Sequence, residues 1–187
     1  MDRTLKYWTD AADALHPDPR PLIGGMRRAA SGASAINIVN PATRKVLFEL
    51  NSAGPQDVDA AIMSAREGFN DKRWRGLGPA RMKAILLSVA NAIEARSEEL
   101  GLLDSLEMGK PISESIFQAT IAASFFRHYA ESIDKLYGEI APSDAYSFGL
   151  CLPEPRGVCA AIVPWNFPII NAALKAAPHW QREIQWF

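Results

Sequence analysis

An unbroken apolar run close to the end of the chain constrains the fold more than any other feature. Residues 158–163 read Val-Cys-Ala-Ala-Ile-Val, and a strand without polar positions is typical of a parallel sheet covered on both faces. Pro164-Trp165-Asn166 predicts a turn, and a helix is expected after it. One strand cannot form a sheet. Either its neighbours lie outside these residues, or the run is a core strand of another fold.

The run belongs to a longer uncharged stretch, residues 157–174, which is long enough to raise the question of a membrane span. Pro164, Asn166 and Pro168 fall in its middle, so a strand, a turn and the start of a helix are the better interpretation. Charged residues are spread through the first twenty positions, where a signal peptide would need an apolar core. We therefore expect no membrane partner and a cytosolic location.

The charge balance argues against binding driven by nucleic-acid phosphates. The chain has 20 Lys plus Arg and 21 Asp plus Glu, a formal net charge of −1, so no nucleic-acid partner is expected. The basic cluster Lys72-Arg73-Trp74-Arg75 is interpreted as a solvated loop with Trp74 tucked under it. A content of 48% hydrophobic and 22% charged residues is that of a folded globular chain.

Elsewhere the hydrophobic spacing predicts helices separated by short strands. Gly54-Pro55 is expected to open one helix, Pro79 a second, and Ser97 to cap its continuation, which Gly109 should end. The expected elements are irregular chain over 1–20, strands over 20–29 and 34–50, helices from 55, from 79 and over 113–136, and an alternating hairpin over 139–152.

Two cysteines limit the covalent and metal chemistry of the chain. Cys151 and Cys159 are too few for a disulfide scaffold or a four-cysteine zinc site, and their apolar surroundings predict two buried, reduced thiols. The sequence has no Walker loop, no G-x-G-x-x-G and no H-E-x-x-H. His128 is expected to be a surface or hydrogen-bonded histidine. No metal site is predicted.

Asn166 is the residue with the clearest claim to chemistry, because it follows the buried strand. In open α/β sheets, ligands bind at the carboxyl ends of the strands. The simpler interpretation is that Asn166 caps the following helix, with Pro168 tolerated in its first turn. The two roles are compatible only if a backbone group or the amide nitrogen is left free.

Several short motifs occur together in a specific order and spacing. They are Leu22-Ile23-Gly24-Gly25, Asn40-Pro41-Ala42-Thr43, Asp57-Val58-Asp59-Ala60-Ala61, Glu107-Met108-Gly109-Lys110-Pro111, Glu154-Pro155-Arg156-Gly157-Val158 and Pro164-Trp165-Asn166-Phe167-Pro168. Through them the chain from Pro21 to Pro178 resembles the NAD(P)-dependent aldehyde dehydrogenase superfamily. Tyr7-Trp8 and residues 129–135 look most like the branch that acts on γ-glutamyl-γ-aminobutyraldehyde and related aminoaldehydes.

The resemblance implies an α/β fold, the N-terminal part of the aldehyde dehydrogenase fold, with helices, the first strand of a Rossmann-like sheet and an oligomerisation hairpin. It also implies that the fold is incomplete. Residues 1–138 and 157–178 would belong to the cofactor-binding domain and 139–156 to the hairpin, through which the chain could form homo- or hetero-oligomers. Residues 179–187 would be a tail foreign to the family.

The family chemistry implied by the resemblance is covalent. A cysteine thiolate attacks the aldehyde, hydride passes to NAD or NADP, and a glutamate-activated water releases the acid. The motif asparagine falls on Asn166, whose side-chain N–H would face the oxyanion. Lys175 matches a lysine implicated in proton relay, although an ordinary exposed helix lysine is an equal alternative. Positions that line the cofactor fall on Ile162, Val163, Pro164 and Trp165.

The chain departs from the family in its length. Family members are well over twice as long, and their catalytic cysteine, general-base glutamate and adenine-ribose lysine lie beyond residue 187. Cys159 cannot replace the nucleophile, because seven extended residues separate it from Asn166 by about 23 Å and attack needs atoms about 3–3.5 Å apart. Nothing near Cys151 resembles a base for it.

The tail itself is compatible with a shifted reading frame. After Pro178 the family would continue close to Ala-Leu-Ala-Ala-Gly-Asn-Ser-Val-Val-Leu-Lys, whereas this chain has His-Trp-Gln-Arg-Glu-Ile-Gln-Trp-Phe over residues 179–187. Codons for the latter, read one base out of frame, permit the former. We expect a one-base deletion near the Pro178 codon. The alternative is a tail with a purpose of its own.

The expected function is therefore that of a truncated aldehyde dehydrogenase whose 187 residues are inactive alone and hold NAD or NADP only weakly. Two alternatives remain open. The chain could be a non-catalytic oligomerisation partner or inhibitor of a full-length homologue that binds through 139–156. It could also be an independent small α/β binding module, which a cooperative melt without any partner would favour.

Overall fold

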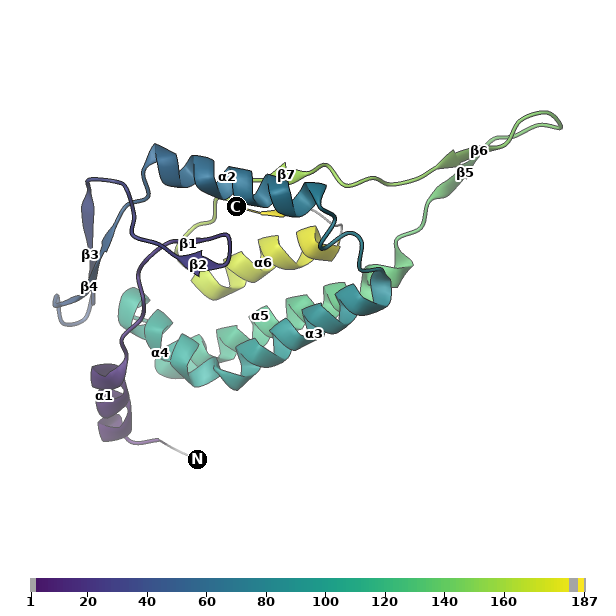
Figure 1. Ribbon diagram of the computed structural model, residues 1–187. Helices are drawn as coiled ribbons and strands as arrows, with labels where there is room; N and C mark the ends of the chain where they lie inside the picture. The colour runs from purple at the N-terminus through teal and green to yellow at the C-terminus, as the bar shows by residue number, and fades with distance from the viewer. Residues whose placement is uncertain (1–2, 182–184, 187) are drawn as a thin grey trace.

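The computed structural model describes residues 3–181, 185 and 186. Helices dominate, and most of the strands are short (Figure 1). The helices are α1 (Leu5–Ala14), α2 (Pro55–Asn70), α3 (Pro79–Ala95), α4 (Ser97–Met108), α5 (Ile112–Ser132) and α6 (Pro168–Gln181), with a 3₁₀ turn at Ile133–Lys135. The strands are β1 (Leu22–Ile23), β2 (Met26–Arg27), β3 (Ala35–Val39), β4 (Val46–Asn51), β5 (Glu139–Ala141), β6 (Gly149–Cys151), β7 (Val158–Cys159) and β8 (Gln185–Trp186).

The core lies between helices, with α5 at its centre. α3, α4 and α6 all pack against α5. Leu86 of α3 and Ala122 and Ala123 of α5 are fully buried, and Ala177 of α6 joins them. Small side chains on α5 and α6 allow the helix axes to approach closely, and dense packing of this kind supplies most of the stability of a helical body. Within these 187 residues, the helical body therefore has its own packing partners.

The start of α2 and the end of α4 lie where the sequence signals placed them. Pro55 is the first residue of α2, and the Asp57 carboxylate accepts hydrogen bonds from the backbone N–H of Gly54 at 2.9 Å and of Ser31 at 2.6 Å. These bonds, the Ser31 bond first, lower the pKa of Asp57. Gly109 ends α4 in the left-handed region, at φ 73°, as its position predicted.

Within the described residues, the strands form four two-stranded sheets: β1–β2, β3–β4 and β5–β6 are antiparallel, and β7–β8 is parallel. The connection from β7 to β8 runs through α6, so β7, α6 and β8 form a βαβ unit. The strand predicted over 158–163 is correct only at Val158–Cys159, because the tail residues 185 and 186 are the neighbours that pair with it. Residues 160–163 carry no secondary structure.

The hairpin β5–β6 projects from the helical body as a long arm (Figure 1). Ile140 pairs with Leu150, and both are largely exposed, as are Phe148 and Leu152. The alternating pattern correctly predicted strands here, but neither strand has a buried residue. No helix in the described part of the chain is long and apolar enough to cross a membrane.

Two further sequence-based expectations were wrong. Residues 1–20 are not irregular throughout, because Thr4 caps the helix α1 by accepting a hydrogen bond from the Tyr7 N–H at 3.3 Å. The Tyr7 hydroxyl in turn lies 3.1 Å from a Glu98 carboxylate oxygen, which ties α1 to α4. Cys151 is exposed and Cys159 half-buried, so the predicted pair of buried thiols is not formed.

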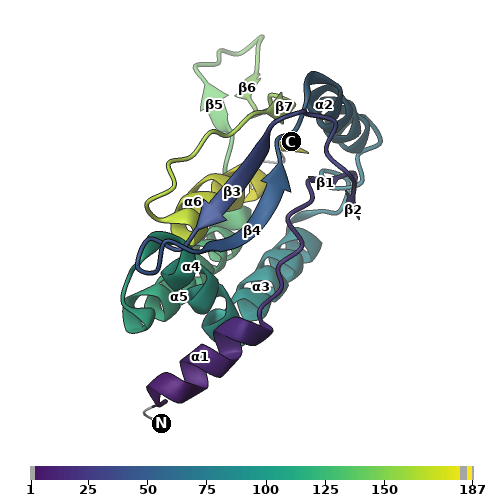
Figure 2. The same cartoon turned by 90° about the vertical axis from the view of Figure 1, so that its left-hand side faces the viewer.

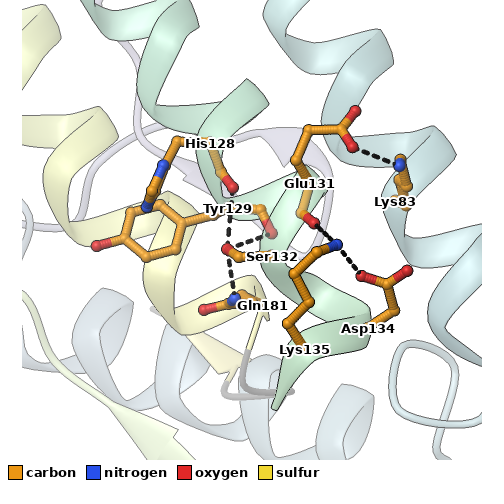
Figure 3. A network of polar contacts seen from close by, with 8 residues as sticks. All are labelled: Lys83, His128, Tyr129, Glu131, Ser132, Asp134, Lys135 and Gln181. Atoms are coloured by element: carbon orange, nitrogen blue, oxygen red, sulfur yellow. Dashed lines mark hydrogen bonds and ion pairs between the residues drawn. The ribbon is translucent and has the colours of Figure 1, made fainter.

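The first residues of segment 179–187 continue α6 into the core. Trp180 packs against Phe126, with ring centroids 5.8 Å apart, and its carbonyl accepts a hydrogen bond from the Trp74 indole N–H at 2.9 Å. Trp74 is thus tucked under its basic loop, as predicted. The Gln181 side-chain amide donates to the Ser132 hydroxyl at 2.8 Å, at the end of α5 (Figure 3).

Candidate functional site

The candidate site is the loop between residues 160–163 and α6. Trp165, Asn166 and Phe167 form a bend, and Pro168 is the first residue of α6. The Phe167 carbonyl accepts the first hydrogen bond of the helix from the Asn171 N–H at 2.8 Å. Pro at this position is favourable, because its fixed φ suits a helix and its missing N–H would have no partner. Phe167, and not Asn166, therefore occupies the cap position.

Asn166 lies two residues before Pro168, the first residue of the helix, and is exposed. Among the described residues no side chain or backbone group forms a hydrogen bond with its amide. The interpretation of Asn166 as the helix cap is thus wrong, and the reason is that the helix begins one residue later than the cap role requires. Both amide hydrogens of Asn166 are left available to a group outside these contacts.

Asn171, in the first turn of α6, is hydrogen-bonded to the loop. Its side-chain amide donates to the Pro164 carbonyl at 3.0 Å, seven residues earlier in the chain. Together with the backbone bond to Phe167, this contact closes the loop at both of its ends. Trp165 and Asn166, which lie between these anchors, are therefore presented by a short segment with restrained ends.

A polar cluster lies behind Phe167. The Lys110 Nζ is 4.5 Å from the centroid of the Phe167 ring, 3.1 Å from the Gln118 Oε1 and 3.3 Å from the Asp104 Oδ2. The Asp104 side chain is only 1% exposed. Glu107 is half-buried nearby, and burial, with the Asp104 charge as a second cause, raises the pKa of its carboxyl. The loop thus rests on a buried, charged support.

The four positions expected to line the cofactor form an exposed apolar surface. Ile162 is 95% and Trp165 78% exposed, and Val163 and Pro164 also face solvent. The structure does not bring them together in a pocket. A cavity of about 560 Å³ lies elsewhere, between α1 and α4, and Trp8 and Leu102 are among its lining residues.

Lys175 lies on α6 and is exposed. Its side chain makes no hydrogen bond or ion pair with the described part of the chain. The position is seven residues beyond Pro168, about 10 Å along the helix axis, so Lys175 and Asn166 are not neighbours in this arrangement. Any joint role needs a substrate or a protein group to bridge them.

Sequence reasoning missed Lys110, Phe167 and Asn171 as members of the site. Lys110 and Phe167 belong to motifs that were recognised, but the sequence gives no sign that these two motifs meet in space. Asn171 had a weak local signal, since an Asn in the first turn of a helix often bonds to nearby backbone.

Comparison with known proteins identifies the family of the chain. The sequence profile of the aldehyde dehydrogenase family matches residues 28–180. The chain belongs to the aldehyde dehydrogenase family. It is 39% identical over 175 residues to the NADP/NAD-dependent aldehyde dehydrogenase PuuC of Escherichia coli, and 38% identical over 170 residues to an aminoacetaldehyde dehydrogenase of Pseudomonas aeruginosa. These matches cover 93% and 89% of this chain, but only 35% and 34% of the two relatives.

Solved structures of the family superpose closely on the chain. A γ-glutamyl-γ-aminobutyraldehyde dehydrogenase from Burkholderia cenocepacia gives a TM-score of 0.93 at 39% identity, over 97% of this chain and 38% of that one. An indole-3-acetaldehyde dehydrogenase from P. syringae, solved with NAD⁺, gives 0.93 at 36% identity, over 97% and 37%. The 187 residues therefore have the fold of the N-terminal part of an aldehyde dehydrogenase and span little more than a third of such a chain.

Proposed function

We propose that these residues supply the oxyanion-binding loop and one face of the cofactor site of an aldehyde dehydrogenase, and that they do not turn over substrate alone. The observation that carries the proposal is the free Asn166 amide, on a loop that Asn171 closes with a 3.0 Å hydrogen bond. A donor fixed before the reaction begins can stabilise a developing negative charge without reorganisation.

Each residue would have a limited role in that reaction. Asn166 would donate a hydrogen bond to the oxyanion that forms when a thiolate adds to the aldehyde. Lys175 would hold or move a proton. Ile162, Val163, Pro164 and Trp165 would contact the dinucleotide through apolar surface, and their exposure in this chain fits one side of such a site. NAD or NADP, when bound, accepts a hydride. The thiolate and the general base would come from residues beyond 187.

For the substrate we propose an aminoaldehyde of the γ-glutamyl-γ-aminobutyraldehyde kind. The support is the identity of 39% to the B. cenocepacia enzyme of that name and of 38% to the P. aeruginosa aminoacetaldehyde enzyme. A cytosolic location is proposed with it, and cell fractionation would test that point.

Activity of the purified chain is the first test. Mixed with NAD⁺ or NADP⁺ and either propanal or an aminoaldehyde, it should give no reduced cofactor above the blank. Clear turnover would contradict the assignment of the nucleophile to residues outside this chain.

Sequencing the gene beyond its stop codon would test the shifted-frame proposal, which requires a downstream frame that encodes Gly-Asn and a Lys-Pro-Ser-Glu-like stretch.

The role of Asn166 in catalysis has to be tested in a protein that turns over substrate. Residues 28–180 can replace the matching part of the E. coli relative to give a chimera. Replacing Asn166 by Ala in an active chimera should lower kcat about 10²–10³-fold, the effect of losing one oxyanion donor. Asn70, exposed at the end of α2, is the matched control, and Asn70→Ala should leave kcat unchanged. An Asn166→Ala chimera with full kcat would overturn the role.

A second candidate function rests on the hairpin. Ile140, Phe148 and Leu150 are 57–69% exposed on an arm that reaches away from the body, which suits pairing with a full-length homologue. Copurification of the chain with an intact dehydrogenase, lost in a Leu150→Lys variant, would support a non-catalytic oligomerisation partner or inhibitor. Independent migration of the two proteins would exclude it.

A further inference from the structure

The motif Glu107-Met108-Gly109-Lys110-Pro111 has no part in the function proposed above, yet its lysine touches the site. Lys110 lies between α4 and α5, far in sequence from the loop, and its ammonium faces the ring of Phe167 at 4.5 Å from the centroid. Phe167 is the residue directly after Asn166. Lys110 is thus in contact with the segment that presents the amide.

Hydrogen bonds fix both the side-chain ammonium and the backbone carbonyl of Lys110. Its ammonium donates to Gln118 of α5 at 3.1 Å and pairs with Asp104 of α4 at 3.3 Å. Its carbonyl accepts a hydrogen bond from the Ser105 hydroxyl at 2.7 Å. The Lys110 side chain is 16% exposed and that of Asp104 1% exposed. A lysine with a fixed backbone and a buried partner for its charge is a rigid support, unlike an exposed lysine whose long stem samples many rotamers.

Phe167 depends on this support. The residue is 42% exposed, so its ring is only partly held by packing, and the attraction of a cation to the face of an aromatic ring adds a direction to the contact. Because the rotamers open to a side chain depend on its backbone dihedrals, a ring held over Lys110 restricts the dihedrals that the Phe167 backbone can adopt. The carbonyl of that residue accepts the bond that starts α6, and its N–H follows Asn166 directly.

We propose that Lys110 is a positioning residue, which acts through Phe167 to hold the Asn166 backbone in one orientation. That this orientation helps to bind an oxyanion rests on the proposed function. The restraint of the Asn166 backbone by Lys110 and Phe167 does not. The competing explanation is that Lys110 serves only to neutralise buried Asp104, with the contact to Phe167 incidental.

The two explanations differ in what happens at Asn166, which NMR relaxation of the full chain, labelled with ¹⁵N-asparagine, measures directly. The chain has seven asparagines, and an Asn166→Gln variant assigns the signal of interest. We expect an order parameter near 0.85 for the Asn166 backbone amide in the wild type, as in rigid backbone, and a fall below about 0.6 in Lys110→Met and Phe167→Leu.

The set of variants separates loop order from general stability. Lys110→Met leaves the buried Asp104 carboxylate without a cation and can unfold the chain. Phe167→Leu keeps the contacts of Lys110 with Asp104 and Gln118, so it is the deciding variant. Lys110→Arg should restore order, because it keeps the cation. Lys83→Met removes another lysine–carboxylate pair, 2.6 Å long, which joins α3 to the C-terminal end of α5 (Figure 3), and should leave the Asn166 amide unchanged.

Some outcomes would overturn the inference. A flexible Asn166 in the wild type would do so, and so would an order parameter that Phe167→Leu leaves unchanged. No substrate or cofactor enters the measurement, so its result is independent of the chimera assay. If Asn166→Ala keeps full kcat in the chimera, the proposed function fails but the restraint on the loop can still hold. If the loop is mobile while Asn166 is essential for kcat, the restraint fails and the proposed function holds.

Discussion

The helical body and the segment 160–167 are both apolar, but only one of them is buried. Leu86 in α3 is completely inaccessible to solvent, whereas Ile162 is 95% exposed. The two side chains have the same size and hydrophobicity. What differs is whether the chain contains a surface to cover them: α5 and α6 cover α3, while the neighbours that residues 160–163 would need are not among the described residues. Burial is thus a property of the available partners and not of the residue type.

α6 connects the two regions. Ala173 and Ala177 pack into the helical core, and the first turn of the same helix anchors the loop through Asn171. A well-packed helix can therefore hold a functional loop in place even though the strand before that loop has few partners of its own. The following predictions are designed to test this contrast.

The largest difference is expected between matched core and surface truncations. Leu86→Ala should lower the free energy of unfolding by about 2–5 kcal/mol, because it removes packed methyl groups and leaves a cavity. Ile162→Ala should change it by less than about 0.5 kcal/mol, as for other exposed positions. Urea unfolding of the two variants, followed by circular dichroism, gives both values. Comparable losses would mean that Ile162 finds a packing partner in solution, for example in a second copy of the chain.

A smaller effect is expected where α4 meets α5. A Cβ added at Gly101 would lie 2.7 Å from the Ile116 backbone N and 2.8 Å from its Cα, and backbone atoms cannot move aside. Overpacking of this kind costs about 1–3 kcal/mol, which exceeds the gain of about 1 kcal/mol from replacing a helical glycine by alanine. Gly101→Ala should therefore lower the thermal midpoint. Ser88→Ala on the exposed face of α3 is the control and should not. A higher midpoint for Gly101→Ala would show that the interface is looser than described.

The smallest effect is expected from Glu107, beside the support of the loop. Burial and the Asp104 charge raise its pKa in the folded chain. The ionised form is therefore less favourable in the folded than in the unfolded state, and the chain gains stability as the pH falls through the folded pKa. Glu107→Gln should be more stable than the wild type at pH 8, and the difference should shrink as the pH falls towards 4.5, the ordinary pKa of the carboxyl. Glu154→Gln, at an exposed position, should show no such trend in thermal melts. A constant difference for Glu107→Gln would contradict the shift.

Features governed by local chemistry could be predicted from the sequence. Pro55 starts α2 and Gly109 ends α4 as expected, because helix starts and stops depend on a few adjacent residues. Ser97 was predicted as a cap but is the first residue of α4, which is the usual size of error at a helix end. The long helix predicted over 113–136 is α5 followed by a 3₁₀ turn.

Features governed by distant partners could not be predicted. The extent of β7 depends on residues 185 and 186, and the pattern of 158–163 contains no information on them. The contact of Lys110 with Phe167 joins two motifs more than fifty residues apart. Asn166 was found because its position after an apolar run is a local signal, while the helix start that leaves its amide free was misplaced by one residue.

The turn at Gly109 packs tightly against a distant part of the chain. A Cβ at this position would approach Pro41 to 2.9 Å, at the tip of the β3–β4 ribbon (Figure 2), and the next residue is Lys110. The tip of the β3–β4 ribbon therefore meets the chain at residues 109 and 110, where α4 ends and where Lys110 supports the loop. A larger residue at position 109 would therefore have to displace either the ribbon tip or the turn that carries Lys110.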